Sequence, residues 1–226
     1  MKLISQQRLK TYTGVLNQKR QQVFEKLGAF SRQGFLAGGT ALALQIGNRF
    51  SYDFDFFCKK PITHGFRAKI KKTLPVKQVA VNTGDEFTFL TPDDIKITFL
   101  YYPFTFRRAL VFPAKGPGLL SVNDIAAAKS YALNRRASYR DYVDLYCILK
   151  HGYAKLPEIL GNAGKVYGSM FSEKLFLAQL TYLGDIPVSE RKSIAFLDSH
   201  EPHGFPEIKS YFDHIVKTYR KRLLSS

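Results

Sequence analysis

The sequence has few of the residues that build disulfide scaffolds or zinc sites. Its 226 residues include two cysteines, Cys58 and Cys147, which lie in apolar surroundings and show no metal-ligand spacing. The five histidines are scattered along the chain. These absences argue against a disulfide-stapled domain and against a Cys/His metal centre, and we expect both cysteines to be reduced core residues.

Long apolar runs are also missing. Nowhere do about eighteen apolar residues follow one another, so the sequence predicts no membrane span. Residues 1–7 contain no apolar segment of the kind found in signal peptides, and we therefore expect a cytoplasmic protein. With 45% hydrophobic residues the composition is that of a globular protein, long enough for one large domain or two modest ones.

Acidic residues are scarce relative to basic ones. The chain has 18 Asp and Glu against 34 Lys and Arg, which gives a formal net charge of +16 and an isoelectric point near 9.8. A field of this sign attracts polyanions and accelerates their encounter. Charge alone is equally compatible with a merely basic surface, so it indicates nucleic acid only together with a phosphate or metal motif.

A glycine pair supplies such a motif. The segment 35–44, FLAGGTALAL, predicts a short strand that ends at Gly38-Gly39 and a helix capped by Thr40. Glycine lets the backbone approach a ligand closely, and the free N–H groups at the start of a helix favour an anion. We therefore predict a phosphate site at this turn.

Two carboxylates follow about fourteen residues later, in the segment 50–57, FSYDFDFF. On a strand, Asp53 and Asp55 would share one face, with Phe54 and Phe56 on the other. Neighbouring carboxylates repel each other unless a cation lies between them. Mg²⁺, or Mn²⁺ in its place, is the natural candidate, because it takes hard oxygen ligands from carboxylates and substrate phosphates.

Other interpretations of this Asp-x-Asp motif remain open. Two surface aspartates beside a loop would look the same, and so would the motif of a sugar-nucleotide glycosyltransferase, although that class does not explain the upstream glycine pair. A phosphatase of the haloacid dehalogenase type is disfavoured, because Ser51 and Tyr52 precede the motif and Phe57 follows it.

A second charged group lies further along the chain. Lys129 and Arg136 are about two helical turns apart, so a single helix would place both cations on one side. Asp141 and Asp144 would share a face of the next helix. The group is either a set of interhelical salt bridges or a lysine that contacts nucleotide phosphates, held by an aspartate behind it.

The order of predicted elements indicates two domains. Strand and helix patterns are mixed up to the turn at residues 115–118, and only helical patterns follow. We predict an α/β (α+β) domain with N-terminal helices over residues 1–118 and a helical domain over residues 119–226. The helical domain ends in a basic run at residues 217–222, a candidate contact for an RNA backbone.

Three segments, 36–42, 53–57 and 124–146, resemble the nucleotidyltransferase toxins of the AbiEii/AbiGii abortive-infection family. The glycine pair and the Asp-x-Asp motif are shared by the whole polymerase-β-like nucleotidyltransferase superfamily, and residues 129–146 are the more specific part. The resemblance implies a minimal nucleotidyltransferase fold, with a mixed sheet flanked by helices. It also implies Mg²⁺-dependent transfer of a nucleotide from a nucleoside triphosphate to an RNA such as tRNA, and an antitoxin protein as partner.

The residues and the resemblance together define a predicted site with three kinds of member. They are the nucleotide-binding residues Gly38, Gly39, Thr40, Lys129 and Arg136, the metal ligands Asp53 and Asp55, and the downstream catalytic pair Lys129 and Asp141.

One position departs from the superfamily pattern. Thr98 stands where a later strand often carries a third carboxylate, and a threonine is neither a carboxylate ligand nor an effective base. The chain would then use two carboxylates alone, borrow Asp94 or Glu86 as base, or have lost activity. In the last case it would be a binding module for nucleotide, RNA or antitoxin.

Overall fold

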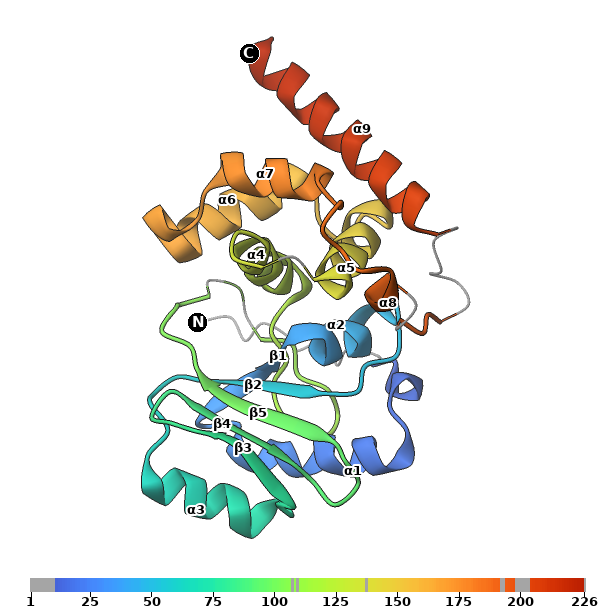
Figure 1. Ribbon diagram of the computed structural model, residues 1–226. Coiled ribbons are helices and arrows are strands. Elements are labelled where there is room, and N and C mark those ends of the chain that lie inside the picture. Colours follow the sequence, from blue (N-terminus) through green and yellow to red (C-terminus); the bar gives the residue numbers. More distant parts are fainter. Residues whose placement is uncertain are drawn as a thin grey trace. The chain divides into compact units, whose positions relative to one another are not determined.

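The computed structural model describes residues 11–106, 108, 110–136, 138–191, 194–197 and 204–225 (Figure 1). The chain forms two compact units. The α/β unit comprises residues 1–103 and 109–121, and the helical unit comprises residues 104–108 and 122–226. The predicted domain boundary at residue 118 stays a prediction. Among the described residues, none of the helices has the length and apolar character needed to cross a bilayer.

The α/β unit is built on a mixed five-stranded sheet in the order β1-β2-β5-β4-β3. Strands β2 and β5 are parallel, and every other neighbouring pair is antiparallel. This confirms the predicted mixed sheet. The strands are β1 (Gly34–Ala37), β2 (Phe54–Cys58), β3 (Gln78–Asn82), β4 (Glu86–Leu90) and β5 (Lys96–Tyr101).

Side chains alternate between the two faces of each strand, and the buried aromatic rings gather on one face of the sheet. Phe56 of β2 and Phe99 of β5 are fully buried, with ring centroids 5.1 Å apart. Phe99 also meets Phe30 and Phe66 edge-on, at 5.2 and 5.7 Å. These rings bring two helical segments onto this face, η2 (Gly28–Phe30), which follows α1 (Gln18–Leu27), and α3 (His64–Thr73).

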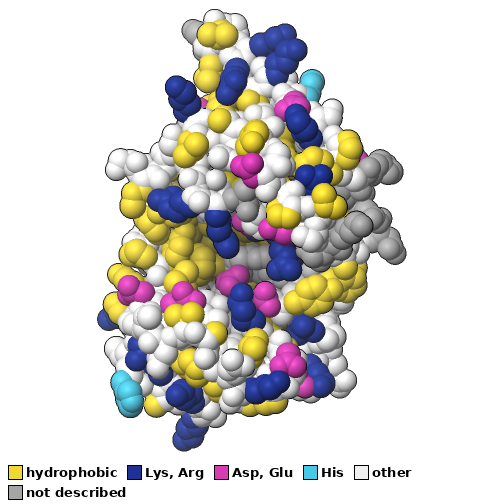
Figure 2. Space-filling view, viewed as in Figure 1, with side chains coloured by type: hydrophobic (Ala, Val, Ile, Leu, Met, Phe, Trp, Pro, Cys, Tyr) yellow, Lys and Arg dark blue, Asp and Glu magenta, His cyan; other side chains and the backbone are white. Residues whose placement is uncertain are grey.

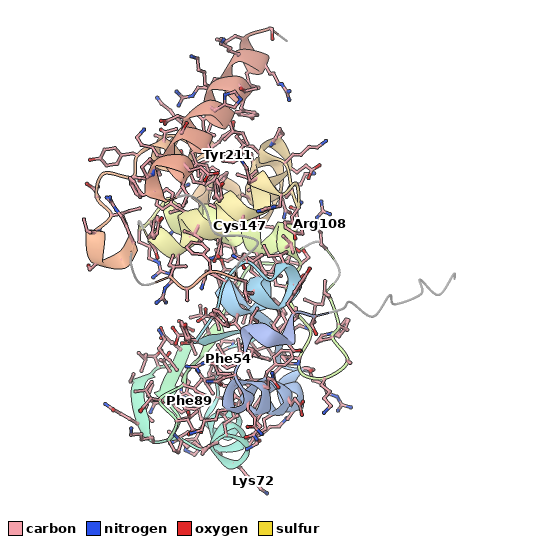
Figure 3. The ribbon with its side chains drawn as sticks, turned by 90° about the vertical axis from the view of Figure 1, so that its right-hand side faces the viewer. Phe54, Lys72, Phe89, Arg108, Cys147 and Tyr211 are labelled. Atoms are coloured by element: carbon pink, nitrogen blue, oxygen red, sulfur yellow. The ribbon has the colours of Figure 1, made fainter. Side chains whose placement is uncertain are left out.

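Figure 3 shows Phe54 and Phe89 inside this unit, whereas Lys72 extends outward from α3. Helix α2 (Gly38–Ile46) follows the short η1 (Thr13–Val15), α1 and η2 in the chain; it packs on β1 and β2, and its residues from Thr40 onward are buried. Because the aromatic rings occupy one face, the alternate positions Asp55 and Thr98 lie on the other.

The helical unit has its core between α4, α5, α6, α7 and α9. Tyr142 of α5 is fully buried and donates to the carbonyls of Gln179 and Tyr182, at 2.9 and 3.2 Å, which ties α5 to the end of α7. Burial raises the pKa of Tyr142 to about 12. The helices are α4 (Val122–Leu133), α5 (Tyr139–Lys150), α6 (Leu156–Tyr167), η3 (Gly168–Met170), α7 (Glu173–Thr181), α8 (Val188–Arg191) and α9 (Phe205–Leu224).

Both cysteines are free and buried, as predicted. Cys58 ends β2 and Cys147 lies on α5 in the interior of the helical unit (Figure 3). Burial raises the pKa of the Cys58 thiol to about 12, so the thiolate that oxidation and metal binding require is absent at neutral pH.

Candidate functional site

The glycine pair opens α2 itself. Gly38 is the first residue of the helix, with φ of +67°, and the preceding Ala37 offers no side-chain cap. The prediction that Thr40 is the N-cap is therefore wrong, because the helix begins two residues earlier. The N–H groups of the first turn have no side-chain cap and remain suited to an anion.

Gly38 is pressed against one of the predicted metal ligands. Ala37 and Asp55 are register partners on β1 and β2, and a Cβ on Gly38 would lie 2.4 Å from Asp55 Oδ2. This contact leaves no room for a side chain, and the positive φ independently favours glycine. The helix start and the carboxylate therefore face each other directly, as the sequence predicts.

Gly38→Ala is expected to damage both stability and activity. A non-glycine residue at positive φ costs roughly 1–2 kcal/mol, and the new methyl must displace the Asp55 carboxylate. A displacement of about 1 Å at a reacting centre costs on the order of 100-fold in rate. Gly65→Ala, in α3 with no atom within 4 Å of the new Cβ, is the control. Thermal melting and nucleotide-transfer assays of both variants check this, and equal behaviour of the two would contradict it.

The prediction that both aspartates lie on one strand holds only for Asp55. Asp55 is inside β2 between the buried Phe54 and Phe56, and Asp53 immediately precedes the strand. The Asp53 side chain is 37% exposed, and its Oδ2 lies 3.9 Å from Nζ of Lys96. Both aspartates are partly buried, and Asp55 lies against the glycine turn.

The donor set fits Mg²⁺. Within the described part of the chain, no group of three or more His, Cys, Asp or Glu side chains is placed to hold a metal. Two carboxylates are a usual protein contribution to a Mg²⁺ that also binds substrate phosphates. Asp53 and Asp55 would supply those oxygens, and the glycine turn beside them would receive the phosphates.

Thr40 has an internal role that the sequence did not reveal. Its hydroxyl is 2.7 Å from Ser51 Oγ and donates to the carbonyl of Asp53. The side chain is buried, and it ties the first turn of α2 to the segment leading into the Asp-x-Asp motif. A phosphate contact from Thr40 would therefore come from its backbone N–H.

Arg49 lies beside the glycine pair, a contact that the sequence analysis missed. A Cβ on Gly39 would lie 2.4 Å from Arg49 Nη2, so the guanidinium lies against the second glycine of the pair. Arg49 is only 6% exposed, and its Nη1 donates to the carbonyl of Phe50 at 3.2 Å. The signal was present in the sequence, where Arg49 is the one charged residue between the glycine pair and Asp53.

Thr98 occupies the position expected of a third carboxylate. It pairs in register with Asp55 across the parallel strands β2 and β5. Of the two acids considered as substitutes, Asp94 lies in the turn before β5, with its Oδ1 2.7 Å from Nζ of Lys77. Glu86 instead accepts a hydrogen bond from Thr88, the partner of Thr98 on β4.

In the helical unit, Lys129 of α4 bridges to α5. Its Nζ is 2.7 Å from Asp141 Oδ1 and 2.7 Å from Asp144 Oδ2. Lys129 is 6% exposed and Asp144 is fully buried, so these ion pairs are shielded from solvent. Asp141 and Asp144 share a face of α5, as predicted. Their contacts with Lys129 are the interhelical salt bridges that were one of the two interpretations of this group.

Arg136 does not accompany Lys129. Helix α4 ends at Leu133, and the exposed Arg136 follows that end, with its backbone N–H bonded to the carbonyl of Ala132. The prediction that one helix places both cations on one side is wrong, because the helix stops too early.

A family model for the nucleotidyl transferase AbiEii toxin of type IV toxin–antitoxin systems matches residues 26–96 and 78–217. These matches cover most of the chain, and the protein belongs to the AbiEii family of nucleotidyltransferase toxins. The resemblance stated from the sequence is thereby confirmed.

The chain is also similar to a curated protein sequence, and solved structures share its fold. An uncharacterized protein of Aquifex aeolicus is 31% identical over 215 residues, covering 90% of this chain and 97% of its own length. JHP933 from Helicobacter pylori shares the fold, with a TM-score of 0.55, 20% identity and coverage of 94% and 96% of the two chains. MenT4, a nucleotidyltransferase toxin from Mycobacterium tuberculosis, gives a TM-score of 0.56 and 14% identity, with coverage of 86% and 80%.

Proposed function

We propose that this toxin is a Mg²⁺-dependent nucleotidyltransferase that moves a nucleoside monophosphate from a nucleoside triphosphate to an RNA such as tRNA. The observation that carries the proposal is the Asp55 carboxylate lying against Gly38, at the start of a helix without a side-chain cap. A metal–triphosphate complex requires N–H groups for its phosphates and a carboxylate for its metal ion, and this arrangement offers both side by side.

Each member of the site has a distinct task in this proposal. A bound Mg²⁺, or Mn²⁺, would neutralise phosphate charge. Asp53 and Asp55 would hold that ion, while the N–H groups of Gly38, Gly39 and Thr40 would bind phosphate oxygens. The attacking RNA hydroxyl forms a bond to the α-phosphorus as the bond to pyrophosphate breaks, and its proton passes to water. Arg49 adds positive charge beside Gly39, where negative charge gathers on the leaving group.

We assign Lys129 and Asp141 as the downstream catalytic pair and Arg136 as a further nucleotide contact. The family resemblance supports this assignment. The carboxylates of Asp141 and Asp144 fix the position of the Lys129 ammonium group.

The proposed acceptor and partner follow from charge and family. A net charge of +16 favours a polyanion such as RNA. Figure 2 shows several Lys and Arg side chains along α9, whose exposed residues Lys217, Arg220, Lys221 and Arg222 form the basic run. An antitoxin protein as partner and a cytoplasmic location complete the proposal.

Incubation of the protein with Mg²⁺, total RNA and each labelled nucleoside triphosphate in turn tests the function. We expect label to appear in an RNA band with at least one nucleotide, and to require the divalent ion. Absence of label with all four nucleotides would contradict the proposal.

The competing function is a binding module without catalysis, and the threonine beside Asp55 is the observation that favours it. Nucleotide binding measured by calorimetry separates the two. Binding with no transfer supports the module, whereas binding with transfer supports the enzyme.

A further inference from the structure

Two tyrosines and an arginine form a layered stack in the helical unit. The rings of Tyr131 on α4 and Tyr167 on α6 are parallel, with centroids 3.9 Å apart and an interplanar angle of 8°. Phe104 meets Tyr131 and Tyr167 edge-on, at 5.4 and 4.7 Å. The guanidinium carbon of Arg135 lies 3.5 Å from the centroid of Tyr131. Because two groups at these distances cannot share one face of a ring, Tyr131 lies between Tyr167 and Arg135.

The stack runs from the interior of the helical unit to its surface. Tyr167 is 2% exposed, Tyr131 is half-buried and Arg135 is exposed. No other described residue forms an ion pair with Arg135 or stacks on it. The guanidinium is therefore the outermost layer, and a planar cation in this place can stack with one more flat group.

Two backbone carbonyls orient the guanidinium. Arg135 Nη1 donates to the carbonyl of Tyr131 at 3.2 Å, and Nη2 donates to the carbonyl of Met170 at 3.5 Å. Together with the Tyr131 ring, these contacts restrict an arginine that is nevertheless exposed. A side chain that is already restricted loses less entropy on binding, so the arrangement favours a ligand that stacks on it.

The chemistry of this surface fits an unpaired nucleobase. Proteins bind the splayed bases of single-stranded RNA by stacking them on aromatic rings and on arginine guanidinium planes. Met170, whose carbonyl holds the guanidinium, is 52% exposed, and a flexible thioether side chain adapts to the edge of a ring. The net charge of +16 attracts the polyanionic strand that carries such a base.

We propose that Arg135, the outer layer of this stack, binds an unpaired base of the acceptor RNA. This inference rests on the proposed function, because it names a place where the helical unit holds the RNA. Tyr131 supports the guanidinium from the inner side, and the base stacks on the outer side. The contact tolerates any base sequence, since every base has a flat face, but it requires that the base be unpaired.

Binding of three probes to an Arg135→Lys variant tests the stack. The probes are a labelled oligoadenylate, whose bases have no pairing partner, a strand of equal length without bases, and ATP with Mg²⁺. Lysine keeps the positive charge but lacks the guanidinium plane. We expect the variant to bind oligoadenylate about tenfold more weakly, in the range of one lost base stack. Its affinities for the strand without bases and for ATP should equal those of the wild type.

Arg191→Lys is the matched control. The Arg191 guanidinium also lies over an aromatic ring, 3.7 Å from the centroid of Phe205, and Nη2 donates to the carbonyl of Ile186 at 2.9 Å. Arg191 is half-buried rather than exposed, so the same substitution there should leave all three affinities unchanged. Thermal melting of both variants sets an assay temperature at which each is folded.

Four results would overturn the inference. An equal loss for the strand without bases indicates a phosphate contact, and a loss confined to ATP indicates that the stack holds the donor nucleotide. Unchanged affinities, or an equal loss in Arg191→Lys, indicate a structural role alone. Transfer assays on the same preparations separate the two proposals. If the wild type transfers nucleotide and Arg135→Lys binds RNA normally, only the stack is refuted. If Arg135→Lys weakens RNA binding but the wild type transfers nothing, only the enzyme is refuted.

Discussion

Asp55→Asn is expected to reduce nucleotide transfer by at least about 1,000-fold. The substitution preserves shape but removes one of two carboxylates proposed to hold the divalent ion, whose stabilisation of transition-state charge amounts to several kcal/mol. Each 1.4 kcal/mol lost from that stabilisation lowers the rate about tenfold. Single-turnover assays with saturating Mg²⁺ and nucleotide measure the effect.

A second readout separates a metal ligand from a structural aspartate. Asp55→Asn should weaken binding of a Mn²⁺–nucleotide complex, as seen by electron paramagnetic resonance, while the melting temperature stays within a few degrees because the side chain is only partly buried and keeps its shape. Asp93→Asn, which loosens the exposed ion pair with Lys19 in the same unit, should change neither. An Asp55→Asn protein that keeps Mn²⁺ affinity and activity would refute the proposed metal site.

Lys129→Met is expected to destabilise the protein by about 3–5 kcal/mol, because it leaves two buried carboxylates without their shared cation. The carboxylates of Asp141 and Asp144 both lie 2.7 Å from Nζ of Lys129, and Asp144 has no exposure to solvent. One oxygen, Asp141 Oδ2, is already buried without a hydrogen-bond partner among the residues that the structure describes, so the carboxylate has little else to replace the lost charge. Urea denaturation gives the free energy of unfolding.

The matched control applies the same substitution to an exposed pair. Lys209 and Asp213 form an ion pair of 2.6 Å on α9, with both side chains about half exposed. Lys209→Met should therefore cost less than about 1 kcal/mol. If Lys129→Met were as stable as Lys209→Met but inactive, the role of Lys129 would be chemical alone, and the proposed structural role would be wrong.

The local pattern of the sequence predicted the parts of the site that depend on neighbouring residues. The period of two places Asp55 on the face of β2 opposite Phe54 and Phe56, and burial of the two rings fixes that orientation. The glycine pair predicted a tight approach of backbone to the motif. Gly38 has the positive φ and the contact with Asp55 that make glycine necessary there.

Tertiary structure alone decided the contacts between segments far apart in the chain. Strand order and register decide that Thr98 lies beside Asp55. They also decide that Glu86, rather than Asp94, accepts a hydrogen bond from Thr88, the partner of Thr98 on β4. The loop after α2 brings Arg49 against Gly39, and no hydrophobic periodicity in the sequence predicts that contact. The sequence by itself determined which face each side chain takes, because side-chain direction is a local property of a strand or helix. Only the packing of distant elements determined the partner that each side chain meets.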